Sequence, residues 1–274
     1  NWSLTSSSGN FAIRYKGVGF VFDVNGMSIL MNSEIKFFIL GILNSVVGNT
    51  ILNVLNPTLA FQAGDISKFP LLLRSNLHIE ELVKRNIEFA KFDWDSRENS
   101  WDFHQNELIR CTSNCGQNCA DIDLLNNEDR DEISGMTKIP TDSNLLEDCY
   151  EAYKSEWRRK FFQLHNNEEE LNRQFIEIYG LQDELTPDVP LEEITILQEE
   201  TTIENGELIF RPEEVMAQFV SYAVGCMFGR YSLDKEGLIL ANQGETLQDY
   251  LEKVGKKEEE LTFVPDRDNI IPVL

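Results

Sequence analysis

The sequence predicts an α+β protein, in which a small antiparallel β-meander packs with helices and a mainly helical segment with a short β-hairpin follows. Three observations lead to this class. Short β-branched and aromatic runs, separated by turn dipeptides, occupy residues 11–31. Apolar residues recur at helical spacing over residues 40–54 and again from residue 146 onward. Finally, Asn205-Gly206, a strong hairpin signal, leads into one of two short apolar runs.

The first 95 residues are expected to form an α/β region. Strands are predicted at residues 11–15, 18–24 and 27–31, because turn dipeptides separate these runs. One helix follows and ends at Asn56-Pro57, since the residue before a proline avoids the α conformation. The helix has an apolar face and a stripe of small residues that lets another element pack closely: Leu40, Leu43, Val47, Ile51 and Val54 in the face, and Gly41, Ser45 and Gly48 in the stripe.

A second helix is predicted at residues 77–91, after an extended piece at 58–61 and a turn at 63–65. Its inward residues recur at spacings of three and four: Ile79, Leu82, Val83, Ile87 and Ala90. Residues 96–143 lack this periodicity and are expected to form an irregular loop or insertion. The aromatic residues expected to anchor this stretch are Trp94, Trp101 and Phe103.

Residues 144–274 are expected to form a mainly helical, acidic region that is truncated at its C-terminus. A long amphipathic helix is predicted to break at His165-Asn166-Asn167 and to stop at Gly180. Short strands are predicted at residues 194–197 and 207–210. A further helix opens at Pro212 and has one apolar face, made of Val215, Phe219, Tyr222 and Cys226.

The charge is unevenly distributed along the 274 residues. A formal net charge of −23 argues against a free-standing nucleic-acid binder, which normally has a basic balance. However, residues 1–110 hold 10 Lys and Arg against 11 Asp and Glu, whereas residues 161–274 hold 8 against 25. The first part of the chain therefore remains a candidate for meeting DNA. The expected division is 1–95, 96–143 and 144–274.

The five cysteines do not indicate a metal centre. Cys111, Cys115 and Cys119 could share a helix face, with Cys149 or His104 completing a set, but structural zinc sites favour pairs with a different spacing. We expect reduced thiols and no bound metal. An odd number of cysteines without a signal peptide favours a cytoplasmic protein, and no apolar run reaches the roughly 20 residues that span a bilayer. We also expect a piece of a longer protein, because the chain opens on Asn1 and stops within an apolar run.

Several stretches carry a specific family resemblance. Residues 40–45 (LGILNS), 55–59 (LNPTL) and 61–66 (FQAGDI) resemble the start of the target-recognition domain of adenine-specific DNA methyltransferases, as in the type IIG group. Residues 145–157, 169–190 and 219–233 extend the likeness over nearly the whole chain. Together they resemble the PglX-type methyltransferases of BREX phage-exclusion systems.

This resemblance implies that the full protein uses S-adenosylmethionine to methylate the exocyclic amino group of adenine in double-stranded DNA. The chain departs from the family in lacking a glycine-rich cofactor loop and an N-P-P-Y-type motif, which holds the extruded adenine. Its Asn-Pro occurs in Asn56-Pro57-Thr58-Leu59, and Gly17-Val18-Gly19 is an isolated G-x-G. We therefore expect the catalytic domain to lie elsewhere in the polypeptide, and assign no catalytic or cofactor-binding residue here.

The candidate DNA contacts are basic residues in the charge-balanced first part: Arg14, Lys16, Lys68 and Arg74. The basic run at residues 158–160, with Lys154, is instead expected to pair with Glu151 and Glu156 at helical spacing. The leading hypothesis is a DNA target-recognition fragment. The alternatives are an acidic protein–protein interaction module of the same defence complex and an acidic DNA mimic, which the net charge would suit.

Overall fold

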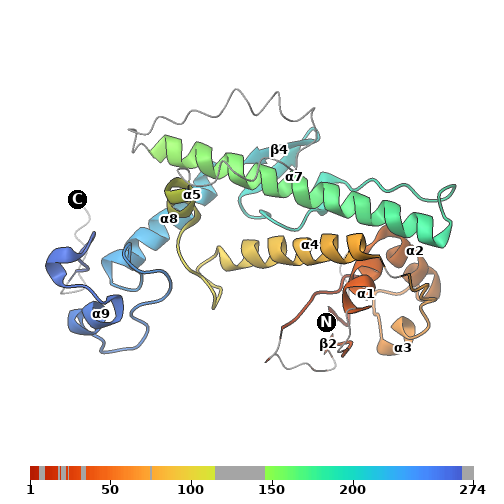
Figure 1. Cartoon of the computed structure of the whole chain (residues 1–274), viewed down its shortest axis with the longest axis horizontal. Coiled ribbons are helices and arrows are strands. Elements are labelled where there is room, and N and C mark those ends of the chain that lie inside the picture. The colour runs from red at the N-terminus through yellow and green to blue at the C-terminus, as the bar shows by residue number, and fades with distance from the viewer. Residues whose placement is uncertain are drawn as a thin grey trace. The chain divides into compact units, whose positions relative to one another are not determined.

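The computed structural model describes residues 1–5, 10–17, 19, 23, 25–31, 35–74, 76–114 and 146–266, without the side chains of 112–114. Helices dominate these residues and accompany two antiparallel two-stranded sheets, which confirms the α+β class (Figure 1). The chain forms two compact units. The first unit comprises Asn1–Lys91 and Phe161–Ile196, and the second comprises Phe92–Lys160 and Leu197–Leu274.

The first unit contains a short sheet and several helices. Its elements are β1 (Trp2–Ser3), β2 (Gly26–Met27), α1 (Ile35–Asn44), α2 (Val46–Leu55), α3 (Ala63–Ile66), most of α4 (Leu77–Asp95), the later part of α7 (Leu146–Tyr179) and η2 (Leu191–Glu193). Its core lies where α1, α2, α4 and α7 bring buried apolar side chains together, including Phe38, Ile42, Val47, Ile79, Val83 and Phe175.

The single helix predicted before Asn56 is two helices. α1 and α2 meet at Ser45 and bend by 72°. The Ser45 hydroxyl donates to the Ile42 carbonyl (2.8 Å) and accepts from the Gly48 amide (3.2 Å), so it closes one helix and caps the next. The bend turns Val54 out of the predicted apolar face, leaving it 79% exposed. The predicted end is confirmed, because α2 stops at Leu55 with Asn56 as its C-cap.

The predicted stripe of small residues does permit close packing. A methyl group added at Gly41 would lie 2.9 Å from Val83 Cγ2 and 3.2 Å from the Phe175 ring. At Gly48 it would overlap the Ile42 carbonyl oxygen and lie 3.0 Å from Leu43 Cα. Gly41 thus admits α4 and α7, whereas Gly48 lets α2 fold back against the end of α1.

The three-stranded meander predicted over residues 11–31 is wrong, because residues 11–15 form no strand and only Met27 of residues 27–31 lies in one. β1 pairs with β2, so residues near the start of the chain supply one strand. Most of the predicted 18–24 strand lies outside the described residues. Of the extended piece predicted at 58–61, Ala60 bridges to Thr5, whereas Thr58 and Leu59 form a bend. The predicted turn at 63–65 is the short helix α3.

The predicted helix at 77–91 is confirmed as α4, although Ala90 is exposed rather than inward. The break predicted at 165–167 is wrong, because α7 continues through it. The Asn167 amide is buried and satisfied from within the unit: it donates to Asn86 Oδ1 (2.8 Å) and accepts from Gln163 (2.9 Å). Gly180, at φ 68°, follows the helix as predicted.

The second unit contains the confirmed hairpin. The hairpin consists of β3 (Thr201–Glu204) and β4 (Glu207–Phe210). Besides the end of α4 and the first part of α7, the unit contains α5 (Glu107–Asn114), α8 (Pro212–Met227), α9 (Leu247–Val254) and η3 (Glu258–Glu260). β4 matches the strand predicted at 207–210 and pairs with β3, whereas the strand predicted at 194–197 is wrong, because these residues form no strand. Asn205 (φ 53°) and Gly206 (φ 80°) form the tight turn, which matches the twist of the strands.

A buried ion cluster organises the second unit. The Arg97 guanidinium lies 2.8 Å from Asp93 Oδ2 and 2.8 Å from Glu200 Oε2, and its side chain is only 13% exposed. Asp93 also accepts from the Leu197 amide (2.9 Å). Burial raises the pKa of Asp93, against the lowering effect of Arg97. Arg97 therefore joins the end of α4 to the segment that leads into β3.

The predicted aromatic anchors behave differently from one another. Phe103 is buried and packs edge-on against Tyr222 and Tyr231, as predicted. Trp94 and Trp101 are exposed, so the prediction is wrong for them. Trp94 lies in the last turn of α4, and Trp101 lies in the turn that precedes Phe103.

Among the described residues, no single helix is long and apolar enough to cross a bilayer; α1 and α2 would pass on length and composition only if taken together.

Replacing Gly48 by alanine tests the packing at the α1–α2 junction. The added methyl group meets backbone rather than a movable side chain. We expect a loss of about 2–3 kcal/mol in the free energy of unfolding, measured by urea denaturation.

Gly64→Ala is the matched control, because a methyl group there meets nothing within 4 Å. Its unfolding free energy should stay within about 1 kcal/mol of the unaltered chain. Equal losses for the two variants would refute the packing at Gly48.

Replacing Arg97 by methionine should destabilise the fold by about 3–5 kcal/mol near pH 7, because two buried carboxylates lose their cation. In the variant, Asp93 should have a folded-state pKa well above its unfolded one, because burial raises it and Arg97 no longer opposes the rise. Protonation then relieves the defect, so the loss should shrink as pH falls towards 4–5. Denaturation at both pH values measures this, and a loss that is independent of pH would contradict it.

Candidate nucleic-acid interface

The segment that carries Arg14 and Lys16 is held in place by asparagine side chains. The Asn44 amide accepts from the Ile13 N–H (3.0 Å) and donates to the Ile13 carbonyl (3.0 Å). Asn49 Oδ1 accepts from the Phe11 N–H (2.8 Å). Side chains of α1 and α2 thus satisfy backbone groups that a neighbouring strand would otherwise pair. Phe11 and Ile13 are buried, and residues 14–16 remain exposed.

An aromatic and cationic cluster lies beside this segment. Lys36 Nζ is 5.6 Å from the centroid of the Tyr15 ring and 4.9 Å from that of Phe37. Lys84 Nζ also lies 4.9 Å from the centroid of the Phe37 ring. The Tyr15 and Phe37 centroids are 6.2 Å apart. We call Tyr15, Lys36, Phe37 and Lys84 the Tyr15 cluster.

The composition of the Tyr15 cluster suits a phosphate backbone. Ammonium groups near ring faces are fixed by cation–π attraction, and they remain able to donate to an anion. Lys84 also has Glu80 3.9 Å away, so part of its charge is balanced within α4. The sequence did not predict Lys36, Phe37 or Lys84 as candidate contacts. The local signal for the first two is that a lysine and a phenylalanine are adjacent at the start of a helix.

Arg14 has an internal electrostatic partner. Burial raises the pKa of Glu168 on α7 to about 7, and the positive charge of Arg14 opposes this rise. Arg14 therefore helps to keep a partly buried carboxyl ionised. This role within the first unit competes with a contact to phosphate.

Lys68 and Arg74 lie on another part of the first unit. Both are exposed, and Lys68 Nζ is 3.9 Å from Asp65 of the short helix α3. The chain between them is pinned by the Tyr179 hydroxyl, which donates to the Pro70 carbonyl (2.9 Å). Arg14 acts on Glu168 of α7, whereas Lys68 lies near Asp65 of α3.

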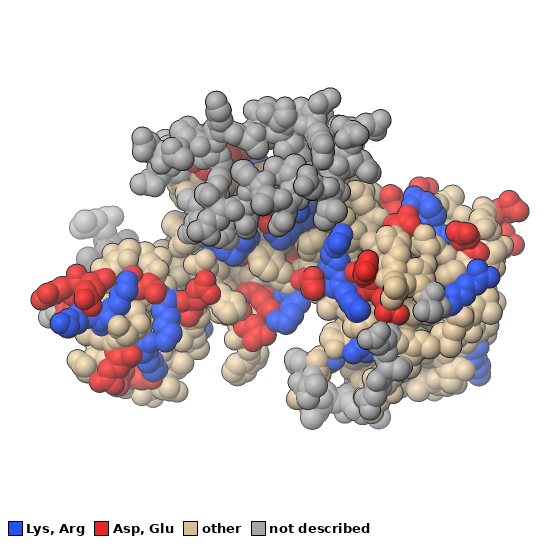
Figure 2. Space-filling model, in the orientation of Figure 1, with Lys and Arg blue, Asp and Glu red and all other residues tan. Residues whose placement is uncertain are grey.

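The basic run at 158–160 is committed to the protein itself, as predicted. Arg159 pairs with Glu156 (3.3 Å), Lys160 also pairs with Glu156, and Lys154 pairs with Glu151 (2.8 Å). Arg158 donates to the Leu208 carbonyl (3.3 Å). On the face drawn in Figure 2, basic and acidic side chains of the described residues are likewise interspersed.

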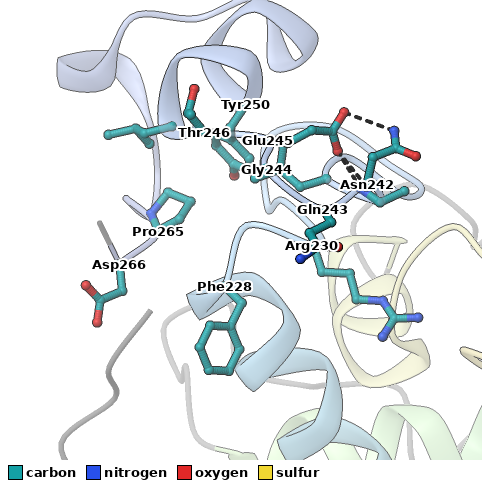
Figure 3. A pocket seen from close by; sticks show the side chains of 13 residues that line it. Phe228, Arg230, Asn242, Gln243, Gly244, Glu245, Thr246, Tyr250, Pro265 and Asp266 are labelled. Carbon is teal, nitrogen blue, oxygen red and sulfur yellow. Dashed lines mark hydrogen bonds between the residues drawn. The ribbon is translucent and has the colours of Figure 1, made fainter. Parts of the chain in front are cut away.

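The second unit contains a pocket of about 400 Å³ near α9 (Figure 3). Phe228 and Tyr250 supply aromatic surface, and Arg230 and Gln243 supply polar groups. Glu245 shapes the loop, since its carboxylate accepts from the amides of Asn242 (2.9 Å) and Ala241 (2.7 Å). Hydrogen bonds from the Asn242 amide, from Lys253 and from the Ala241 amide, in this order of size, lower the pKa of Glu245 to about 2. None of the predicted DNA-contact residues lines this pocket.

The cysteines within the described residues form no metal centre. No group of three or more His, Cys, Asp or Glu side chains there has a geometry that could hold a metal ion. Cys111 is buried in α5, and burial raises the pKa of its thiol to about 12. Cys115 and Cys119 lie outside the described residues, so the predicted state of the three remains a prediction.

Comparison with known proteins gives two curated relatives, whereas no family model matches. One is "Adenine-specific methyltransferase PglX" of Lacticaseibacillus casei (strain Zhang), 32% identical over 271 residues, which cover 98% of this chain and 19% of the relative. The other is "Adenine-specific methyltransferase BrxX" of Escherichia coli O9:H4 (strain HS), 31% identical over 280 residues, covering 100% of this chain and 20% of the relative. Over nearly its whole length, the chain is related to PglX-type adenine-specific methyltransferases. The matching stretch makes up about one fifth of the length of each relative.

Proposed function

We propose that the chain is the DNA target-recognition segment of an S-adenosylmethionine-dependent, adenine-specific DNA methyltransferase of a phage-defence system. The observation that carries the proposal is the coverage. Both relatives bear the name of this activity, and both align with nearly all of this chain but only a fifth of their own length. The remaining length leaves ample room for a separate catalytic domain, which would be the partner of this segment in the same polypeptide.

The local structure of Asn56-Pro57 supports a role outside catalysis. Its asparagine amide donates to Asp65 Oδ2 (2.8 Å) and to the Ala60 carbonyl (2.7 Å). The Asn56 oxygen accepts from both the amide and the hydroxyl of Thr58. The bonds from Thr58 occupy the side-chain oxygen that would accept from an adenine amine, and all of these bonds hold the exit of α2 instead. Cofactor binding and methyl transfer therefore belong to the catalytic domain.

The Tyr15 cluster supports the DNA-facing role. Phosphate contacts position a protein on a duplex, and Lys36 and Lys84 are cations held on a rigid helical scaffold. Arg14 and Lys16 lie on the adjoining exposed segment. The acidic second half would face away from the duplex, because its carboxylates repel phosphate. An enzyme of this kind would act on DNA in the cytoplasm.

Replacing Lys36 and Lys84 by glutamine should weaken duplex binding and flatten its salt dependence. Each lost phosphate contact should reduce the slope of log K against log salt by about 0.9. Fluorescence anisotropy with a labelled duplex at several salt concentrations measures both effects. The unaltered chain should bind no more tightly than about 10⁻⁴ M at physiological salt, because its net charge is −23.

Lys154→Gln with Arg159→Gln is the matched control. It removes two charges from the chain, but both already pair with glutamates on α7. This variant should keep the salt slope of the unaltered chain. If the control lost more affinity than the Lys36 and Lys84 variant at equal folded stability, the DNA face would be misplaced.

The chain should not bind S-adenosylmethionine. The sequence has no glycine-rich loop preceding a helix, and its Asn-Pro dipeptide is engaged at the exit of α2. Isothermal titration of the chain with the cofactor should give only heats of dilution. A saturable isotherm with unit stoichiometry would place the cofactor site in this segment and overturn the assignment.

A further inference from the structure

Three leucines are exposed where the chain passes from α3 into the start of α4 (Figure 1). Leu72, Leu73 and Leu77 are 49%, 54% and 74% exposed. Their neighbour Leu71 instead packs against the core of the first unit. Burial of apolar surface is favourable, so leucines exposed close together mark a surface that another molecule can cover with a gain in free energy. We call Leu72, Leu73, Arg74 and Leu77 the leucine surface.

Two side chains of α7 hold the leucine surface in place. The Tyr179 hydroxyl accepts from the Leu72 amide (3.2 Å) and donates to the Pro70 carbonyl (2.9 Å). The Gln174 side-chain oxygen accepts from the side-chain amide of Asn76 (3.2 Å). Positions 174 and 179 are five residues apart on one helix, which is about 7.5 Å along its axis. The leucines therefore lie on a short, anchored stretch, and covering them requires little further ordering of its backbone.

Arg74 adds a positive charge to the leucine surface. It is exposed and makes no ion pair with another described residue, so its guanidinium is available to a carboxylate of another molecule. A phosphate contact, predicted for Arg74 from charge balance, suits this surface poorly, because protein–DNA interfaces are more polar than protein–protein interfaces. The leucine surface instead matches a protein face that is apolar and carries a carboxylate at its edge.

The small size of the leucine surface indicates a tethered partner. Three leucines and one arginine fall far short of the roughly 20–30 residues that each side contributes to a stable interface between separate proteins. A small surface can stay docked when its partner belongs to the same polypeptide, because the tether gives an effective concentration on the order of millimolar. This chain matches only 19% and 20% of the length of its two curated relatives, so the remaining length can supply such a partner.

We propose that the leucine surface docks on the catalytic domain of the same polypeptide, with the leucines against an apolar face and Arg74 paired with a carboxylate. The inference rests on the proposed function, because that function requires a catalytic domain outside this chain. It assigns Arg74 to the contact between domains and leaves the DNA to the Tyr15 cluster.

The test replaces Leu73 by the photoreactive amino acid p-benzoylphenylalanine in the full-length enzyme. Irradiation should join this position to a residue of the same polypeptide that lies outside the 274-residue segment, and mass spectrometry of the digested product identifies that residue. Adding Arg74→Glu should lower the yield of the cross-link about tenfold, because it places like charges opposite each other. Circular dichroism of the 274-residue chain should be unchanged by either substitution, because both side chains are exposed.

The same photoreactive residue at Leu238 is the matched control, since Leu238 is also 54% exposed but lies in the second unit. Its cross-link to the catalytic domain should form in several-fold lower yield. Equal yields at the two positions, or an undiminished yield with Arg74→Glu, would overturn the proposal. So would the absence of a cross-link from position 73, or one found only within the segment, to DNA or to a separate protein.

Methyl transfer to DNA, measured on the same preparation, separates this inference from the proposed function. An enzyme that cross-links as expected but transfers no methyl group would refute the proposed function and leave the docking of the leucine surface in place. An enzyme that methylates DNA but gives no cross-link from position 73 would refute the docking alone.

Discussion

The sharp bend at Ser45 is the constraint on which the first unit depends. It places the N-terminus of α2 where Asn172 of α7 accepts from the Val46 amide (3.0 Å), so a residue distant in sequence secures the junction. The same bend presents Asn44 and Asn49, from different helices, to one extended segment. Without it, neither the packing at Gly48 nor the exposure of residues 14–16 would follow.

The two units solve the problem of buried polarity in different ways. The first uses neutral amides, such as Asn167 and Asn172, whose donors and acceptors are matched by nearby backbone or side-chain groups. The second buries full charges, with Arg97 between Asp93 and Glu200. Neutral amides have a smaller desolvation cost than ions, whereas a buried ion cluster is sensitive to the loss of any one member.

Local signals in the sequence predicted the elements whose limits are set locally. Pro212 opens α8 and Asn56 ends α2, because a proline restricts its own backbone and that of the residue before it. Gly180 follows α7, because glycine readily adopts the positive φ found there. The bend at Ser45 was missed, since a serine within an apolar run becomes a cap only when the next helix turns away. The continuity of α7 was also missed, because Asn167 is stabilised by Asn86, far away in sequence.

The candidate DNA surface shows the same limit. Arg14 and Lys16 were predicted from charge balance, but the Tyr15 cluster combines residues 15, 36, 37 and 84, which only the fold brings together. Charge alone also could not reveal that Arg14 acts on Glu168. The exposure of Trp101 was unexpected for a related reason, since composition predicts burial of tryptophan and only the hydrogen bonds of the turn decide its direction.

The paired hydrogen bonds between Asn44 and Ile13 also fix a register. Side chains alternate along an extended chain, so a slip of one residue would exchange its inner and outer faces. Such a slip would bring Arg14 towards the apolar site now filled by Ile13 and expose Phe11. The Asn44 amide, together with Asn49 at Phe11 and the backbone bonds between Asn1 and Arg14, thus selects which set of side chains reaches the surface.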